Sequence, residues 1–283
     1  MDLFLWSPTV FPIVEMSHTC SDINLPMLKR HFIIGCDGKK NTIYDLHRRE
    51  IIPITELIAS TNGDAIWIDG MFGGIYDTSS GFIDQKYRYT QNYSSPPAVL
   101  QTGQLFITHE YSAQLNIEGQ SIKIDLTVPP QKWYASGLSS CGPVWVDIHH
   151  DIWLYRTKEH TTEKIVQRGN YPRHIHTNGS WVYWVEDDSI RGWNCESAEY
   201  DSIAAVVIDR IALLGGTDQT FKKPIVCWSA WMNEDYGADI VCSDGRHLKR
   251  RGHQLWPSIG DRKLMFRGED TLYFVHLDEK TKR

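Results

Sequence analysis

Short apolar runs and turn residues alternate along the whole chain, and one pattern returns about every 40 residues. In each copy, an apolar run rich in β-branched and aromatic residues ends in an acidic residue, and a second short apolar run follows. Seven acidic residues mark the ends of these runs: Asp37, Asp69, Glu110, Asp147, Asp187, Asp235 and Asp270. A period of roughly 20 to 50 residues is typical of repeat folds, in which neighbouring units cover each other's apolar surfaces.

Each repeat contains four candidate strands separated by turn residues. In the third repeat these are 97–102, 104–109, 113–117 and 121–126, and in the fifth they are 171–177, 180–185, 190–195 and 201–207. Pairs such as Asn178-Gly179 and Asp244-Gly245 accept a positive φ at low cost, so they favour hairpins over helices. Residues 201–224 stay open between a helix and strands, because the apolar positions within 201–214 also fit one helical face.

Seven four-stranded repeats predict an all-β fold, with residues 1–283 forming one domain, a single seven-bladed β-propeller. The last repeat lacks a convincing fourth strand, because only residues 277–283 follow its third. We therefore expect an N-terminal strand, within 3–6 or 9–14, to pair into the last blade. This pairing would remove two exposed sheet edges and close the ring.

The repeats resemble β-propeller blades of the TolB type or of a degenerate WD40 type, over about residues 3–277. Trp67-Ile68-Asp69 and Trp145-Val146-Asp147 have a spaced form of the WD40 signature, but no repeat has the Trp-Asp dipeptide itself. The resemblance implies a fold and carries no particular partner with it.

Charge and hydropathy exclude several classes of function. The formal net charge is −6 with a pI near 6.0, and the basic residues are scattered except at Lys249, Arg250 and Arg251. We therefore expect no nucleic-acid partner. No apolar run approaches the roughly 18 residues of a membrane span, and the N-terminus lacks the features of a secretory signal. These observations predict a cytoplasmic protein without a membrane partner.

The six cysteines, Cys20, Cys36, Cys141, Cys195, Cys227 and Cys242, are widely spaced, and no pair has CxxC spacing. A chain of this length does not need disulfides to stabilise a core. Four of the six, Cys36, Cys195, Cys227 and Cys242, lie in or beside apolar runs, so we expect buried free thiols. We expect neither a metal site nor a cofactor.

The loops at one end of the predicted strands are the candidate binding face. In a propeller, the loop between the second and third strands of a blade shares a face with the connection into the next blade. The proposed ligand-binding residues on this face are four aromatics and four acids: Tyr93, Tyr134, Tyr171, Trp256, Asp69, Glu110, Asp147 and Asp187. Two structural alternatives stay open: the acids are ordinary turn residues, and the aromatics wedge between blades.

A polar cluster, Arg173-His174-Ile175-His176, falls on the predicted inner strand of the fifth blade. Alternation along a strand points His174 and His176 to the same side, towards the central channel. With His149, these residues are candidates for acid–base catalysis or metal binding. The sequence contains no GxSxG, P-loop or HExxH motif, so whether the protein is an enzyme stays open.

Two functional hypotheses follow from the sequence. The first is a non-catalytic interaction propeller that binds a protein or a glycan, including a cationic one, through an acidic face that carries aromatics. The alternative is a small-molecule enzyme with a histidine-based, metal-assisted site at the channel mouth.

Overall fold

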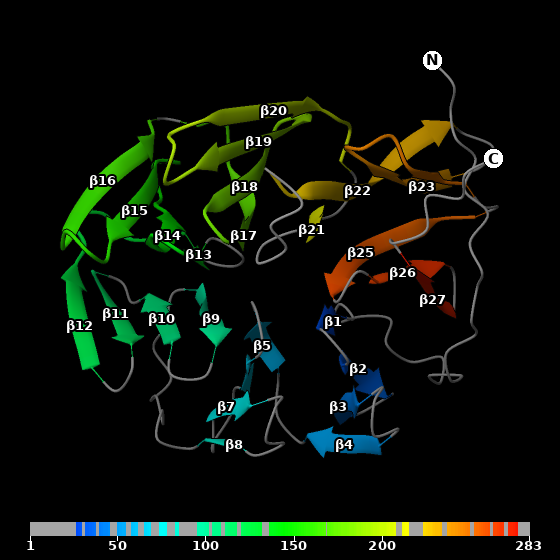
Figure 1. Ribbon diagram of the computed structural model, residues 1–283, viewed down its shortest axis with the longest axis horizontal. Helices are drawn as coiled ribbons and strands as arrows, with labels where there is room; N and C mark the ends of the chain where they lie inside the picture. Colours follow the sequence, from blue (N-terminus) through cyan, green and yellow to red (C-terminus); the bar gives the residue numbers. More distant parts are fainter. Residues whose placement is uncertain are drawn as a thin grey trace. The chain divides into compact units, whose positions relative to one another are not determined.

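The computed structural model of this chain describes its strands and the better placed of its turns (Figure 1). The described residues are 27–29, 32–37, 40–45, 50–54, 58–61, 65–68, 74–77, 83–84, 95–101, 104–108, 111–117, 120–131, 136–167, 169–207, 211–214, 223–233, 237–249, 252–260, 263–268 and 271–276. Side chains are described at Phe106 and at most of these positions from Tyr111 onward.

The chain divides into two compact units, residues 56–202 and residues 1–55 with 203–283. We call them the central unit and the terminal unit. Every regular element described in either unit is a β-strand, and each sheet is antiparallel with its strands in chain order. The prediction of an all-β fold built from four-stranded antiparallel sheets is confirmed to this extent.

The central unit contains four four-stranded sheets. Their strands are β5 (Ile58–Thr61), β6 (Ala65–Ile68), β7 (Gly74–Asp77) and β8 (Ile83–Asp84); β9 (Ser95–Gln101), β10 (Gln104–Thr108), β11 (Ser112–Ile117) and β12 (Gln120–Asp125); β13 (Ser136–Ser139), β14 (Gly142–Val146), β15 (Ile152–Arg156) and β16 (Thr161–Val166); and β17 (Arg173–Asn178), β18 (Trp181–Glu186), β19 (Ser189–Asn194) and β20 (Tyr200–Ala204). Their first strands, β5, β9, β13 and β17, lie side by side in sequence order, as in successive propeller blades.

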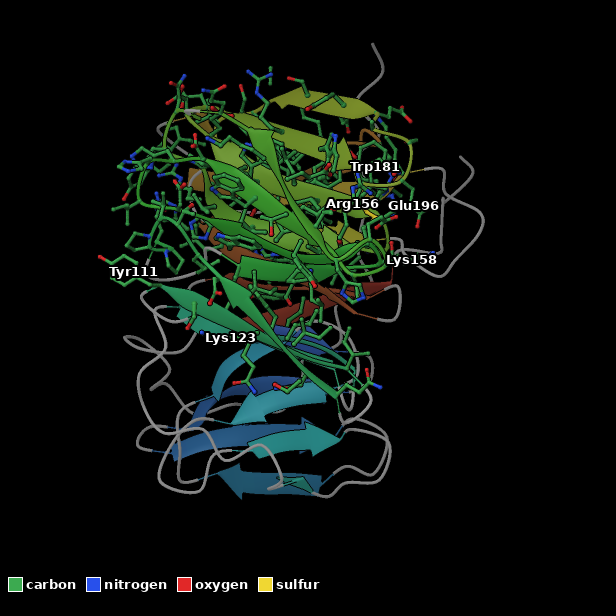
Figure 2. The ribbon with its side chains drawn as sticks, turned by 90° about the vertical axis from the view of Figure 1, so that its left-hand side faces the viewer. Tyr111, Lys123, Arg156, Lys158, Trp181 and Glu196 are labelled. Carbon is green, nitrogen blue, oxygen red and sulfur yellow. A yellow bond between two sulfur atoms is a disulfide. The ribbon has the colours of Figure 1, made fainter. Side chains whose placement is uncertain are left out.

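The loops at the two ends of the central unit's strands carry different side chains. Figure 2 shows Tyr111 at one end and Arg156, Lys158, Trp181 and Glu196 at the other. The loops from second to third strands and the connections into the next sheet share the end that carries Tyr111.

The terminal unit contains sheets from both ends of the chain. They are β1 (Met27–Lys29), β2 (Phe32–Asp37), β3 (Lys40–Asp45) and β4 (Glu50–Ile54); β21 (Ile211–Leu214), β22 (Ile225–Asn233), β23 (Gly237–Cys242) and β24 (His247–Leu248); and β25 (Gln254–Gly260), β26 (Lys263–Gly268) and β27 (Thr271–His276). Strand β25 contacts both β21 and β1, so the C-terminal sheet lies beside the N-terminal one.

Three strands are described in the C-terminal sheet. The segments 3–6 and 9–14, expected to complete it, lie outside the described residues, so ring closure stays a prediction. The question left open at 201–224 is answered for the part the structure describes. Strands β20 and β21 occupy 200–204 and 211–214, and neither segment is helical.

Strand β14 shows how the core forms, because all five of its residues are buried. On one face, Val144 and Val146 belong to a cluster with Val182 and Trp184 of the next sheet. On the other face, Trp145 packs in a cluster with Phe106 of the preceding sheet. A strand covered on both faces needs apolar residues at successive positions, which explains the unbroken apolar runs. Each large apolar side chain buried in this way contributes about 1.5 to 3 kcal/mol.

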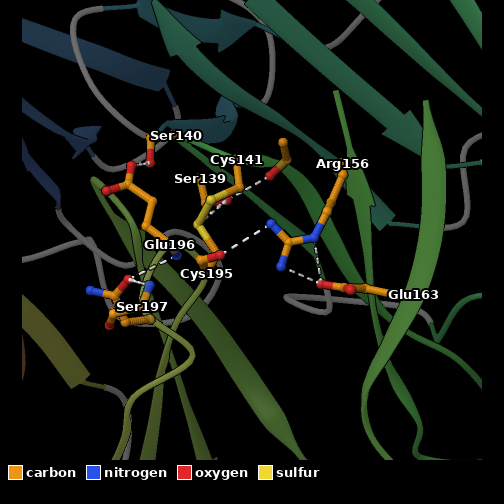
Figure 3. The surroundings of a disulfide bond; sticks show 10 residues. Ser139, Ser140, Cys141, Arg156, Glu163, Cys195, Glu196 and Ser197 are labelled. Carbon is orange, nitrogen blue, oxygen red and sulfur yellow. Dashed lines mark hydrogen bonds and ion pairs between the residues drawn. A yellow bond between two sulfur atoms is a disulfide. The ribbon is translucent and has the colours of Figure 1, made fainter. Parts of the chain in front are cut away.

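Two disulfides correct the expectation of free thiols. Cys227 and Cys242 face each other directly across β22 and β23, with Cα atoms 4.0 Å apart. Cys141 and Cys195 lie in turns of neighbouring sheets, and their disulfide joins these turns with Cα atoms 6.2 Å apart (Figure 3). Spacing along the sequence did not reveal these pairs, because strand register and sheet packing bring the sulfurs together. The side chain of Cys36 and the whole of Cys20 lie outside what the structure describes.

Tyr183 on β18 is the largest fully buried side chain described. Its ring stacks on Trp181, and its hydroxyl donates a hydrogen bond of 2.9 Å to Asp201 Oδ2. The absence of a side chain at Gly192 makes room for the ring, since a Cβ there would lie 2.4 Å from it. Burial, followed by the hydrogen bond and charge of Asp201, raises the pKa of Tyr183 above its usual value.

We expect the contribution of this phenol to stability to disappear at alkaline pH. The raised pKa keeps Tyr183 protonated in the folded state, while the unfolded chain ionises it near pH 10. The contribution is therefore complete below about pH 10 and is lost as the pH rises further. Urea unfolding of the wild type and Tyr183→Phe checks this. At pH 8 the wild type should be more stable by about 1 to 2 kcal/mol. A difference that stays constant up to pH 11 would contradict the expectation.

Candidate functional site

The end of the central unit that carries Tyr111 presents three large apolar side chains to solvent. Tyr111 follows β10 and is 58% exposed, Ile148 follows β14 and is 51% exposed, and Tyr171 precedes β17 and is 62% exposed. We call the surface formed by Tyr111, Ile148, His149, His150, Asn170, Tyr171 and Asp187 the loop face. All of these residues lie in loops at the same end of the strands.

Backbone hydrogen bonds connect the loops of the loop face across two sheets. The N–H of Leu126 donates to the carbonyl of Tyr111, and the N–H of Ile148 donates to the carbonyl of Pro129. The segment 126–131 therefore ties the loop of sheet β9–β12 to that of sheet β13–β16. At its end, the side chains of Gln131 and His150 hydrogen-bond at 2.6 Å.

Tyr171 is held against His150 of the preceding sheet. Their ring centroids are 5.0 Å apart in an edge-on arrangement, and the carbonyl of His150 accepts a hydrogen bond from Gly169. His150, Tyr171 and Asp187 all have left-handed φ values, of 66°, 54° and 49°. Such values cost energy for residues other than glycine, and they gather at sites where a fold holds a loop in a defined shape.

Acidic side chains fasten the connection that carries Tyr171. Glu186 accepts hydrogen bonds from the backbone N–H of Asn170 and from the indole N–H of Trp184. Asp187 accepts a hydrogen bond of 2.9 Å from the side-chain amide of Asn170. Asp187 is exposed and lies on the loop face; a ligand-binding role for it stays a prediction.

Asp147 lies inside the protein, not on its surface. Its carboxylate is fully buried and accepts hydrogen bonds from the backbone N–H groups of His149 and Asp151, and from the indole N–H of Trp153. Asp151 in turn pairs with Lys164, whose ammonium lies 4.8 Å from the Trp153 ring centroid. Asp147 therefore fixes the shape of the loop that presents Ile148 and His149.

The other predicted ligand-binding residues are not described in enough detail to place them. Tyr93, Tyr134, Asp69 and Glu110 lie outside the described residues. Trp256 is on β25, and its side chain is not among those described. Their roles stay predictions.

The histidine cluster lies on β17, as the sequence predicted, but the strand is irregular there. One extra residue separates Arg173 from His176 relative to the partner strand, and His174 has a left-handed φ of 54°. Simple alternation therefore does not relate the two half-buried histidines. Arg173 is exposed at the start of β17, and His149 is exposed on the loop face. Within the described ranges, no three His, Cys, Asp or Glu side chains are grouped to hold a metal ion.

The terminal unit has a second aromatic–histidine contact. Trp231, near the end of β22, is 47% exposed, and its ring centroid lies 5.4 Å from that of His253. His253 Nδ1 accepts a hydrogen bond from the backbone of Ala238. As in the pair of His150 and Tyr171, a residue near the second-to-third-strand loop meets one in the connection into the next sheet.

The sequence analysis did not single out Tyr111, Ile148, Trp231 or His253. Ile148 reads as a continuation of the apolar run through Val146, although Asp147 ends the strand. A usable signal exists for His253, because Gly252-His253 is a Gly-His pair of the kind found in WD40 repeats.

Known structures similar to this chain are β-propellers. A chain of the Mitotic Checkpoint Complex matches with a TM-score of 0.62 at 9% identity, over 96% of this chain and 92% of that one. The RRP9 WD40 repeats match with a TM-score of 0.57 at 11% identity, over 94% of this chain and 99% of that one. BamB from Moraxella catarrhalis matches with a TM-score of 0.53 at 10% identity, over 96% of this chain and 99% of that one. PorZ of Porphyromonas gingivalis matches with 0.50 at 9%, over 89% of this chain and 44% of its own length.

Identities this low show the fold alone, and the chain has a β-propeller fold. No protein-family model matches the sequence, and no curated protein matches it by sequence. Across the described residues, no helix is long and apolar enough to span a membrane.

The buried Asp147 and the exposed Asp187 should behave differently when they are removed. Asp147→Ala leaves three buried or partly buried N–H donors without their acceptor, so we expect a loss of about 3 to 5 kcal/mol in the free energy of unfolding. Asp187→Ala removes an exposed carboxylate and should cost at most about 1 kcal/mol. Urea unfolding of both variants measures the difference. Similar losses in the two variants would refute the structural role of Asp147.

Proposed function

We propose that this chain is a non-catalytic, protein-binding β-propeller that contacts its partner through the loop face. The observation that carries the proposal is the grouping of Tyr111, Ile148 and Tyr171, each more than half exposed, at one end of the strands of one unit. Exposed apolar side chains grouped in this way are typical of protein interfaces. The similar propellers include a member of the Mitotic Checkpoint Complex, a multiprotein assembly by its name.

The geometry of Tyr171 suits an interface anchor. The residue stands on a connection that hydrogen bonds to Glu186 and Asp187 hold in place, and its ring rests against His150. A side chain already held in position loses little conformational entropy on binding, so more of its contact energy appears as affinity. Tyrosine is also among the residues that most often dominate interface energetics.

The polar groups at and beside the loop face are already hydrogen-bonded within the loops, which favours a protein ligand over a glycan. Sugar recognition needs several side chains that direct hydrogen bonds at the ligand beside an aromatic face. Here the carboxylates of Asp147 and Glu186 and the amide of Asn170 bond to other parts of the loops. The apolar side chains of Ile148 and Tyr111 complement apolar protein surface better. One acidic group, Asp187, and one basic group, Arg173, are both exposed at this end of the strands. The face therefore carries both signs of charge and does not require a cationic partner.

The ring itself is proposed to have seven blades closed by the N-terminal segment. The described strands form seven sheets, and β25 already lies next to β1. Deleting residues 1–14 should then destabilise the domain strongly, because the last sheet loses its outer strand. A truncated chain with an unchanged melting temperature would refute this closure.

The cytoplasmic location expected from the sequence stays a prediction that cell fractionation can check.

Binding should depend on Tyr171 and not on an equally exposed tyrosine elsewhere. We expect Tyr171→Ala to weaken partner binding by about 30-fold or more, the loss typical of an interface anchor. Tyr200→Ala is the matched control, because Tyr200 is 64% exposed on the outer strand β20 of the same unit. The measurement is quantitative capture from a lysate of the producing cells on immobilised full-length protein, followed by binding curves for each captured protein.

Three outcomes would overturn the assignment. Equal capture by the wild type and Tyr171→Ala would remove the anchor. Selective loss with Tyr200→Ala would move the interface to β20. Loss of binding after enzymatic removal of glycans from the lysate would replace the protein partner by a glycan. Circular dichroism of each variant confirms that the fold is retained.

A further inference from the structure

The two disulfides stand in different structural settings. Cys141 lies in the turn between β13 and β14, and Cys195 directly follows β19, so their bond links two neighbouring sheets. Cys227 and Cys242 are register partners within a single sheet. The first bond joins residues 54 apart in sequence and the second joins residues 15 apart.

The two bonds also differ in access. Cys227 and Cys242 are both buried, as is Cys195, whereas Cys141 is only partly buried. A thiolate must approach a disulfide sulfur directly in order to reduce it, so exposed disulfides are the labile ones. Cys141 is therefore the most accessible residue of the two described disulfides, and it is where an external thiol is expected to react first.

The surroundings of Cys195 can accommodate a free thiol (Figure 3). The Ser139 hydroxyl lies 3.9 Å from Cys195 Sγ, and it donates to the carbonyl of Gly142. A Cys195 thiol can then donate to this hydroxyl oxygen. Arg156 Nη1 donates to the Cys195 carbonyl at 3.1 Å, and its guanidinium pairs with Glu163, so these contacts hold the Cys195 backbone independently of the disulfide.

We propose that the bond between Cys141 and Cys195 is a redox-sensitive lock between sheets β13–β16 and β17–β20, which a dithiol reductant opens before it opens the bond between Cys227 and Cys242. A thiolate of the reductant attacks Cys141 Sγ, the S–S bond breaks, and Cys195 leaves as a thiolate that takes up a proton. The second thiol of the reductant attacks the mixed disulfide, which releases Cys141 and leaves the reductant as its own disulfide.

Hydrogen bonds around the lock keep the turns in place after reduction. The N–H of Cys195 donates to the carbonyl of Ser180, and the N–H of Ser140 donates to that of Gly179. Asn194 Oδ1 accepts hydrogen bonds from the N–H groups of Glu196 and Ser197. Opening the lock therefore loosens the link between two sheets and leaves each sheet folded. In a reducing cytoplasm the lock is open, and in an oxidising compartment it is closed.

The test is a redox titration of the full-length, air-oxidised protein in dithiothreitol buffers of increasing reduced-to-oxidised ratio. Free thiols are alkylated at each ratio, the disulfides are then reduced and alkylated with a heavier reagent, and peptide mass spectrometry reports each cysteine separately. We expect half-reduction of Cys141 and Cys195 at a ratio at least tenfold lower than that of Cys227 and Cys242. The melting temperature should fall in two steps that follow the two pairs.

Paired variants give the controls. Cys141→Ser with Cys195→Ser should lose the first thermal step, and Cys227→Ser with Cys242→Ser should keep it. If the second variant does not fold, the labelling order in the wild type decides alone. Reduction of Cys227 and Cys242 first or together with the other pair would overturn the proposal. Labelling of Cys141 and Cys195 as thiols before any reductant is added would overturn it as well.

Discussion

The structure depends on the packing of neighbouring sheets, which buries both faces of inner strands such as β14. Residues Val144 and Val146 of β14 face the sheet that follows, and Trp145 between them faces the sheet that precedes. A single sheet with two apolar faces is not stable in water, so each sheet of the central unit requires its neighbours. This constraint makes inner strands such as β14 apolar at successive positions, whereas the outer strands β12, β16 and β20 carry polar, exposed residues. The strand ends are the places where sequence can vary for function.

At the loop end of the central unit, acidic side chains fix the loops that expose apolar side chains to solvent. Asp147 satisfies two loop amides and an indole from a fully buried position, and the loop it shapes presents Ile148 to solvent. Glu186 does the same for the connection that presents Tyr171. Each acid shapes the backbone of its loop, and in the proposed interface the exposed neighbour, Ile148 or Tyr171, makes the contact. A charge-based description of the face misses this division of roles.

Local patterns predicted the strands well. The third repeat was expected at 104–109, 113–117 and 121–126, and the structure has β10, β11 and β12 within one residue at each of these ends, because alternation and Gly-containing turns are local signals. The features that depend on contacts distant in sequence were missed. Cys141 and Cys195 meet only when two sheets pack, and the bulge at His174 arises from pairing with β18. The burial of Asp147 follows from the path of its turn, which composition does not encode.

The loop face and the disulfide lock are connected through two strands. Strand β14 begins next to Cys141 and ends next to Asp147, and β19 begins close after Asp187 and ends next to Cys195. A strand of five residues spans about 16 Å, so the bond lies at a distance from the proposed contact residues. None of the hydrogen bonds described for Asn170, Glu186 and Asp187 involves a residue of the lock. The disulfide therefore restrains the spacing of the two sheets that carry Ile148 and Tyr171, while the local shape of each loop is set by its own acid, the buried Asp147 or the half-buried Glu186.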